Sequence, residues 1–153
     1  MKEYHLIIPD EEYRIIEFKQ DGFPGIAFIN IALRDFGPKE VFSWHLSIII
    51  DFEDLIENGM PSHTETDIVD PFGDYLDSLF KGLDKDKPNA LFLGRVTWNA
   101  TRQLMWRVYE PEMVNQELQK IIEKNEHPRE FDYRIEEDSE WAFAKWYLTD
   151  YKT

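Results

Sequence analysis

The sequence predicts an α+β fold, in which a ferredoxin-like βαββαβ sandwich carries an added N-terminal β-hairpin and a C-terminal helix. Three observations support this prediction. Segments rich in β-branched and aromatic residues alternate with two segments of helical periodicity. Turn residues separate the strand-like segments in pairs, as in β-hairpins. The length of 153 residues is that of one typical domain, so we expect a single α+β domain over residues 1–153.

Composition and turn residues indicate six strands. The longest contains the apolar run Ile48-Ile49-Ile50, which is typical of a central strand that is covered on both faces. In chain order, the predicted strands are residues 13–19, 26–33, 41–52, 90–97, 103–109 and 131–135.

Three helices are expected. Asp70 is the predicted N-cap of the first, with Pro71 at its first position, and apolar residues at helical spacing continue to about Leu83. The preceding residues 62–69 are then a polar loop. The second and third helices are expected over residues 111–126 and 140–148.

The chain is strongly acidic. Seventeen Lys and Arg against 31 Asp and Glu give a net charge of −14, and ten acidic residues but no Lys or Arg lie between Glu40 and Phe80. This charge argues against nucleic-acid and anionic-membrane partners, because both are polyanions. It favours a basic protein partner, although an acidic surface also serves solubility alone.

Composition also indicates the cellular compartment of the protein and limits the cofactors that it could bind. The chain has no cysteine, which excludes disulfides and thiolate metal sites. No stretch approaches the ~20 apolar residues of a membrane span, and the N-terminal apolar run is too short for a signal peptide. We therefore expect a soluble cytoplasmic protein, with no cofactor and no metal.

Histidine side chains offer two candidates for chemistry. His63, Glu65 and Asp67 alternate in the predicted loop and could gather around a divalent ion, but the spacing matches no standard metal loop. His45 lies in the apolar third strand, where it could act as a buried general base or simply be hydrogen-bonded. A small metal-dependent or His-based hydrolase is therefore one alternative function, with no catalytic residue assigned.

The second predicted hairpin carries a pair of arginines on one face. If it turns at residues 98–101, Thr97 lies opposite Arg102, Arg95 opposite Leu104, and Leu93 opposite Trp106. Arg95 and Arg102 then share a face, and Arg107 lies on the other. Beside Trp98 and Trp106, the two arginines could bind an anion or small ligand, or they could pair with the chain's own carboxylates, which we favour.

The last predicted helix is apolar around most of its circumference. Trp141 lies on one stripe with Ala144 and Leu148, and Phe143 and Trp146 continue the apolar character around most of the remaining circumference. Such a helix either packs deeply in the core or docks a partner, and the sequence leaves both interpretations open.

Several short motifs carry a resemblance to a known family. GRVT at 94–97 followed by TRQLMWRVY at 101–109 resembles the hairpin of the bacterial family called domain of unknown function 695. Asn58-Gly59-Met60-Pro61 resembles its mid-chain motif, and Asp138 with Trp141 resembles its closing acidic-tryptophan helix. Ala100 stands where the family has glycine, and Trp106 where tyrosine is more usual.

The resemblance implies a compact α+β domain without an assigned activity. The family is also similar in pattern to the ribonuclease E inhibitor protein B group, acidic proteins that act by binding an enzyme, which implies a binding role.

Together these observations predict a non-enzymatic protein-binding or regulatory module, inhibitor-like or immunity-like, that docks a basic protein. A sensor of anions or small ligands is the second alternative, and it requires Arg95 and Arg102 to be free of carboxylate partners. The predicted binding residues are Arg95, Trp98, Arg102, Trp106, Trp141, Phe143 and Trp146.

Overall fold

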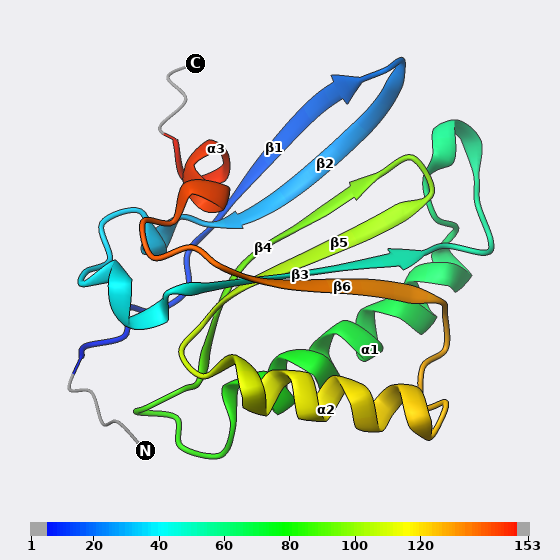
Figure 1. Ribbon diagram of the computed structural model, residues 1–153. Helices are drawn as coiled ribbons and strands as arrows, with labels where there is room; N and C mark the ends of the chain where they lie inside the picture. The colour runs from blue at the N-terminus through cyan, green and yellow to red at the C-terminus, as the bar shows by residue number, and fades with distance from the viewer. Residues whose placement is uncertain (1–5, 150–153) are drawn as a thin grey trace.

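The computed structural model describes residues 6–149 as one antiparallel sheet with the two long helices on one face (Figure 1). The six strands have the spatial order β1-β2-β4-β5-β3-β6. The strands are β1 (Tyr13–Gln20), β2 (Phe23–Asn30), β3 (Trp44–Asp51), β4 (Ala90–Trp98), β5 (Thr101–Val108) and β6 (Phe131–Glu137). The helices are α1 (His63–Lys81), α2 (Pro111–Glu123) and α3 (Lys145–Leu148). The predicted α+β class and the order of elements along the chain are confirmed.

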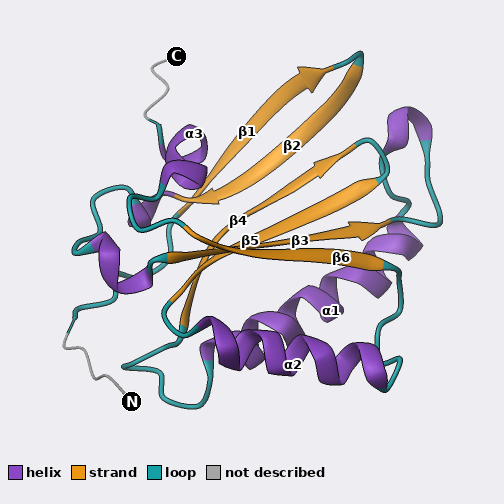
Figure 2. Ribbon diagram, viewed as in Figure 1, coloured by secondary structure: helices purple, strands orange, loops and turns teal. Residues whose placement is uncertain are grey.

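The sheet separates two hydrophobic clusters. Figure 1 shows α1 and α2 side by side beneath the sheet, where they bury Leu46, Ile48 and Ile50 of β3. The opposite face is covered mainly at one end of the strands, by the segment after β2 and by the chain around α3 (Figure 2). Ile49 points to this less covered face and is 41% exposed, so the prediction that the third strand is covered on both faces is wrong there.

The β1–β2 hairpin extends beyond the two long helices (Figure 1). Successive side chains of β1 point to opposite faces of the sheet. Those on the helix face are not covered by α1 or α2, so Tyr13 is 45% exposed and Ile15 is 58% exposed. The hairpin and α1 therefore flank a space that no helix fills.

The predicted register of the second hairpin is confirmed at two of three pairs. Thr97 lies opposite Arg102 and Arg95 opposite Leu104, whereas a register shift after Phe92 places Phe92, not Leu93, opposite Trp106. Because cross-strand partners share a face, Arg95 and Arg102 both point toward α1.

The prediction that Asp70 caps the first helix is wrong, because the N-cap of α1 is Ser62, eight residues earlier. The side chain of Ser62 accepts a hydrogen bond from the Glu65 N–H at 3.1 Å and caps the helix. Pro71 lies within the helix on its exposed side. Proline has no N–H to donate to the carbonyl of the preceding turn, but water can hydrogen-bond to that carbonyl on the exposed side. The helix ends at Lys81, so Leu83 is fully exposed and is not part of the buried stripe.

The last predicted helix is shorter than expected. Trp141 has a left-handed backbone with φ 58°, which interrupts helix formation. Only a short 3-10 turn, Ala142–Ala144, and the single turn of α3 follow it. Across the described chain, no helix combines the length and apolar character needed to cross a membrane.

Candidate functional site

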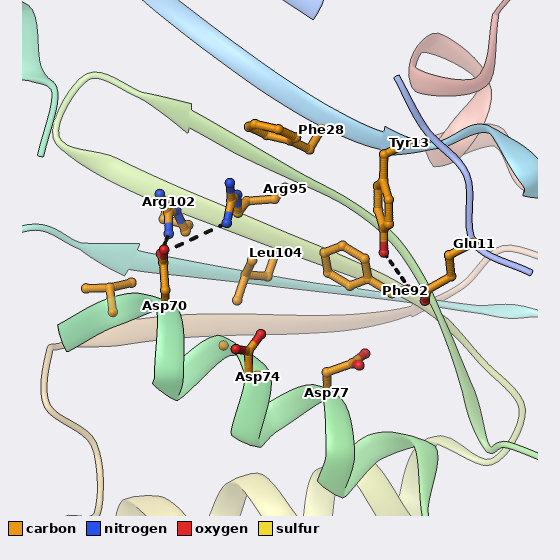
Figure 3. Close-up of a pocket in the computed structure, with 12 residues that line it drawn as sticks. Glu11, Tyr13, Phe28, Asp70, Asp74, Asp77, Phe92, Arg95, Arg102 and Leu104 are labelled. Atoms are coloured by element: carbon orange, nitrogen blue, oxygen red, sulfur yellow. Dashed lines mark hydrogen bonds and ion pairs between the residues drawn. The ribbon is translucent and has the colours of Figure 1, made fainter. Parts of the chain in front are cut away.

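A pocket of about 300 Å³ lies between α1 and the strands β1, β2, β4 and β5 (Figure 3). It occupies the space left where the first hairpin extends beyond the helices. Charged residues of both signs and three aromatic rings surround it. The lining residues are Glu11, Tyr13, Phe28, Val69, Asp70, Gly73, Asp74, Asp77, Phe92, Arg95, Arg102 and Leu104.

One end of the pocket is cationic. Arg102 is buried, pairs with Asp70, and donates from Nε to the Thr97 hydroxyl at 3.3 Å. The Arg95 guanidinium lies 4.5 Å from the centre of the Phe28 ring, and its Nη1 is 4.0 Å from the same Asp70 oxygen. Burial, and then the charge of Arg95, lower the pKa of Arg102. Two guanidinium groups therefore share one carboxylate.

Arg95 is the less satisfied of the two arginines. Its Nε atom is buried and has no hydrogen-bond partner among residues 6–149. Its distance to Asp70 exceeds hydrogen-bonding length, and its side chain is 31% exposed toward the pocket. The sensor alternative requires both arginines to be free of carboxylate partners. Arg102 is paired with Asp70, whereas Arg95 is beyond hydrogen-bonding distance from that carboxylate.

The other side of the pocket is anionic. Lys81 bridges Glu11 at 3.1 Å and Asp77 at 2.9 Å. The Tyr13 hydroxyl donates to Glu11 at 2.8 Å, and burial together with this carboxylate raises the pKa of Tyr13. Asp74 projects from the middle of α1 (Figure 3). Among the described residues, none donates a hydrogen bond to its carboxylate or forms an ion pair with it.

Apolar groups form the base of the pocket. The rings of Tyr13 and Phe92 are in tilted contact with centroids 6.3 Å apart, and Leu104 lies beneath Gly73. A Cβ atom at Gly73 would come within 3.3 Å of Leu104 Cδ1, so glycine permits the close approach of α1 to the sheet.

A second polar cluster lies on the opposite face of the sheet around Arg107, whose side chain is fully buried. Its Nη1 donates to Asp138 at 2.9 Å and to His45 Nδ1 at 3.2 Å, and its Nη2 donates to the Phe42 carbonyl at 3.2 Å. The Trp141 ring lies 4.8 Å from the guanidinium carbon. Asp138, His45 Nδ1 and the Phe42 carbonyl thus all accept hydrogen bonds from this one buried guanidinium.

His45 belongs to this closed cluster. Burial, and then the positive charge of Arg107, lower its pKa to about 4, so the imidazole is neutral. Since a guanidinium only donates hydrogen bonds, His45 Nδ1 is the acceptor. The Phe143 ring stacks on the imidazole with centroids 5.2 Å apart. The structure therefore gives His45 a packing role rather than access to a substrate.

The three residues of the candidate metal motif point in different directions. Glu65 is fully buried and forms a two-point ion pair with Arg129, which lowers its pKa to about 2. His63 and Asp67 lie outside, 3.6 Å apart. Within residues 6–149, no group of three or more His, Asp or Glu side chains is placed to hold a metal ion. The hydrolase alternative predicts that some of these side chains, or His45, converge on one pocket, whereas Glu65 and His45 are buried in separate clusters and His63 and Asp67 are exposed.

One comparison with known proteins identifies the family. A family model described as a family of unknown function, DUF695, matches residues 15–149. The chain belongs to the DUF695 family. No curated protein and no solved structure is significantly similar to the chain.

The residues that carry the DUF695 resemblance form structural contacts. The Gly59 carbonyl accepts from the Ala100 N–H at 2.8 Å, so the mid-chain motif packs directly on the hairpin turn. At Gly59 a Cβ atom would come within 3.1 Å of the Asn99 and Ala100 backbone. At the other end, Asp138 and Trp141 enclose Arg107.

The aromatic residues predicted to bind a partner fall into two groups. Trp106 and Trp141 are buried: the Trp106 indole donates to Asp77 at 2.9 Å, and the Trp141 indole donates to the Lys39 carbonyl at 2.8 Å. Trp98 is half-buried beside the hairpin turn and donates to the Gln20 carbonyl. Phe143 and Trp146 are 48% and 51% exposed, on the face opposite the pocket.

Sequence analysis identified the arginines of the pocket but not its other walls. Tyr13 and Phe28 belong to the first hairpin, and Asp74 belongs to α1, so only tertiary structure brings them to Arg95. A signal existed for the acidic wall, because Asp70, Asp74 and Asp77 recur at the spacing of one helix side.

Proposed function

We propose that this DUF695 protein is a non-enzymatic binding module that docks a basic protein on the exposed side of α1. One observation carries the proposal: from His63 to Phe80 the helix has no Lys or Arg, and its exposed side presents Asp67 and Asp74 beside Ile68 and Tyr75. Ile68 is 36% exposed and Tyr75 is 46% exposed. Carboxylates would attract a basic surface, and the tyrosine would anchor it.

The net charge of −14 supports this assignment. Long-range attraction accelerates the encounter with a cationic partner, and it weakens as salt screens the charges. The similarity in pattern to the ribonuclease E inhibitor protein B group, which is itself part of this proposal, would also favour a protein partner. A cytoplasmic location, which the absence of cysteine favours, is part of the same proposal.

We place the docking surface on α1 rather than on α3. Phe143 and Trp146 are exposed, but they belong to the segment around α3, which lies across the sheet from α1 (Figure 1). Phe143 is also stacked on His45, and Trp146 contacts Phe18 and Tyr147. The exposed side of α1, in contrast, combines charge and apolar area on one element.

A ferredoxin-like core is the architectural part of the proposal. It would comprise β3, α1, β4, β5, α2 and β6. The spatial order β4-β5-β3-β6 and the position of both helices on one face support this topology.

The test is quantitative affinity capture from native lysate at low salt with three forms of the full chain. D67N/Y75S alters the exposed side of α1, and D132N/W146S is a matched control that removes one carboxylate and one half-exposed aromatic ring elsewhere. We expect a basic protein to bind the wild type and the control, to be reduced about tenfold or more on D67N/Y75S, and to be released by ~0.5 M salt. Loss on the control with retention on D67N/Y75S would contradict the proposal, as would equal capture by all three forms.

A further inference from the structure

We infer that the pocket between α1 and the β1–β2 hairpin binds a small zwitterion, a free α-amino acid or the ends of a short peptide, with its carboxylate on Arg95 and its ammonium group toward Asp74. Asp74 borders both this pocket and the proposed docking surface, but Asp67 and Tyr75, whose substitution tests docking, do not line the pocket, so the two proposals can fail separately.

The charge distribution in the pocket is dipolar. At one end, Arg95 and Arg102 have only Asp70 between them, which leaves one positive charge in excess. Along α1 and just before β1, three carboxylates have one cation, Lys81, among them, which leaves a negative excess. They are Asp74, Asp77 and Glu11. Figure 3 shows the arginines at one end and Glu11 at the other, with Asp74 between them on the helix side.

Each end has an unused hydrogen-bonding group. The buried Nε–H of Arg95 has no partner among the described residues, and its Nη1 is beyond hydrogen-bonding distance from Asp70. A ligand carboxylate in the pocket would accept from the partly exposed Arg95 side chain and supply the second negative charge. On the other side, the exposed carboxylate of Asp74 has no described donor, and an ammonium group would supply one.

Size and polarity narrow the ligand class. A volume of about 300 Å³ corresponds to about ten water molecules at roughly 30 Å³ each, which lies at the small end of ligand pockets. A simple anion would face Asp74 and Asp77, and a simple cation would face Arg95. A molecule with both charges avoids either repulsion, and the Tyr13, Phe28 and Phe92 rings provide faces for an ammonium group and for an apolar side chain.

The experiment is calorimetric titration of the full chain, supported by thermal shift, with the standard L-α-amino acids and glycyl dipeptides up to about 10 mM, which detects millimolar dissociation constants. N-acetylated amino acids, amino-acid amides, acetate and methylammonium are the single-charge probes. We expect at least one zwitterion to bind and each blocked form to bind about 10- to 100-fold more weakly, since each loses a hydrogen bond to a charged group. Whether the free amino acid or the dipeptide binds more tightly distinguishes the two sources.

Variants locate the site. R95M keeps an aliphatic chain over Phe28 and removes the guanidinium, and D74N removes the carboxylate; each should weaken binding about 10- to 100-fold. R134M and D132N make the same charge changes on β6, at exposed positions outside the pocket, and should bind as the wild type does. The inference is overturned if no zwitterion binds, if acetate or an amide binds equally well, or if R95M retains wild-type affinity.

Discussion

Two arginines on neighbouring strands, Arg107 of β5 and Arg95 of β4, have opposite environments. Arg107 is fully buried, and Asp138, His45 and the Phe42 carbonyl accept its hydrogen bonds. Arg95 is 31% exposed in a pocket, and its buried Nε–H has no partner among the described residues. The same side chain is therefore a structural element on one face of the sheet and an available binding group on the other.

This contrast lies within the residues that carry the DUF695 resemblance, because the hairpin motif contains both Arg95 and Arg107. Asp138 and Trp141, which carry the DUF695 resemblance, enclose Arg107, while Gly59 supports the hairpin turn. A buried charge that is fully paired is costly to disrupt, whereas an exposed and poorly paired charge contributes little to stability. The closed cluster around Arg107 thus contributes to stability, whereas Arg95 of the same hairpin lines the pocket for which we propose a binding role.

The largest expected effect is at Asp138. Its carboxylate accepts from Arg107 and from the N–H groups of Ala142 and Phe143, so D138A leaves a buried guanidinium without its counter-ion. We expect a loss of about 3–5 kcal/mol in the free energy of unfolding, measured by urea denaturation. D132A, at an exposed carboxylate of β6, should change it by less than about 0.5 kcal/mol. A loss at D138A as small as that of D132A would contradict the structural role of the Arg107 cluster.

A smaller effect should appear with pH through His45. Its pKa is about 4 in the folded protein against an ordinary value of 6.5, so the unfolded chain binds more protons between these values. The free energy of unfolding should therefore fall as the pH is lowered from about 6.5 to about 4. Compared with H45Q, the wild type should lose on the order of 2–3 kcal/mol more over this window, as measured by urea denaturation at each pH. Parallel curves for the two proteins would show that the imidazole is not held neutral.

The smallest effect concerns the hairpin turn that Gly59 supports. Ala100 has φ 66°, a left-handed backbone that costs an L-residue free energy and that glycine adopts readily. A100G should raise the free energy of unfolding by about 0.5–1 kcal/mol and leave ligand binding in the pocket unchanged. Thermal and urea denaturation measure the change in the free energy of unfolding. Destabilisation by A100G would show that the turn is not strained.

Sequence analysis predicted those parts of the molecule that depend on local pattern. Alternation along the second hairpin placed Arg95 and Arg102 on one face, because cross-strand pairing follows from a short turn. The start of α1 was visible in Ser62 and Glu65, a capping pair, but Pro71 indicated a later start. Here the cap and tertiary packing outweighed the local preference of proline.

The features that the sequence did not predict depend on contacts between segments that are distant in the chain. Trp141 is buried and Trp146 is half-exposed although both lie in the same apolar segment, because only Trp141 reaches the Lys39 and Phe42 carbonyls. Similarly, no local pattern shows that Arg102 takes Asp70 and leaves Arg95 underpaired. Such sharing of partners is decided by tertiary structure alone.

The most direct test of the contrast is to make the same substitution at both arginines and to compare urea denaturation of R107M and R95M. The structural account predicts that R107M loses about 3 kcal/mol or more in the free energy of unfolding, because Asp138 stays buried without its partner. It predicts that R95M changes the same quantity by less than about 1 kcal/mol, because the lost guanidinium is partly exposed and poorly paired. Equal losses at the two positions, or a larger loss for R95M, would contradict the division between a closed structural cluster and an open binding pocket.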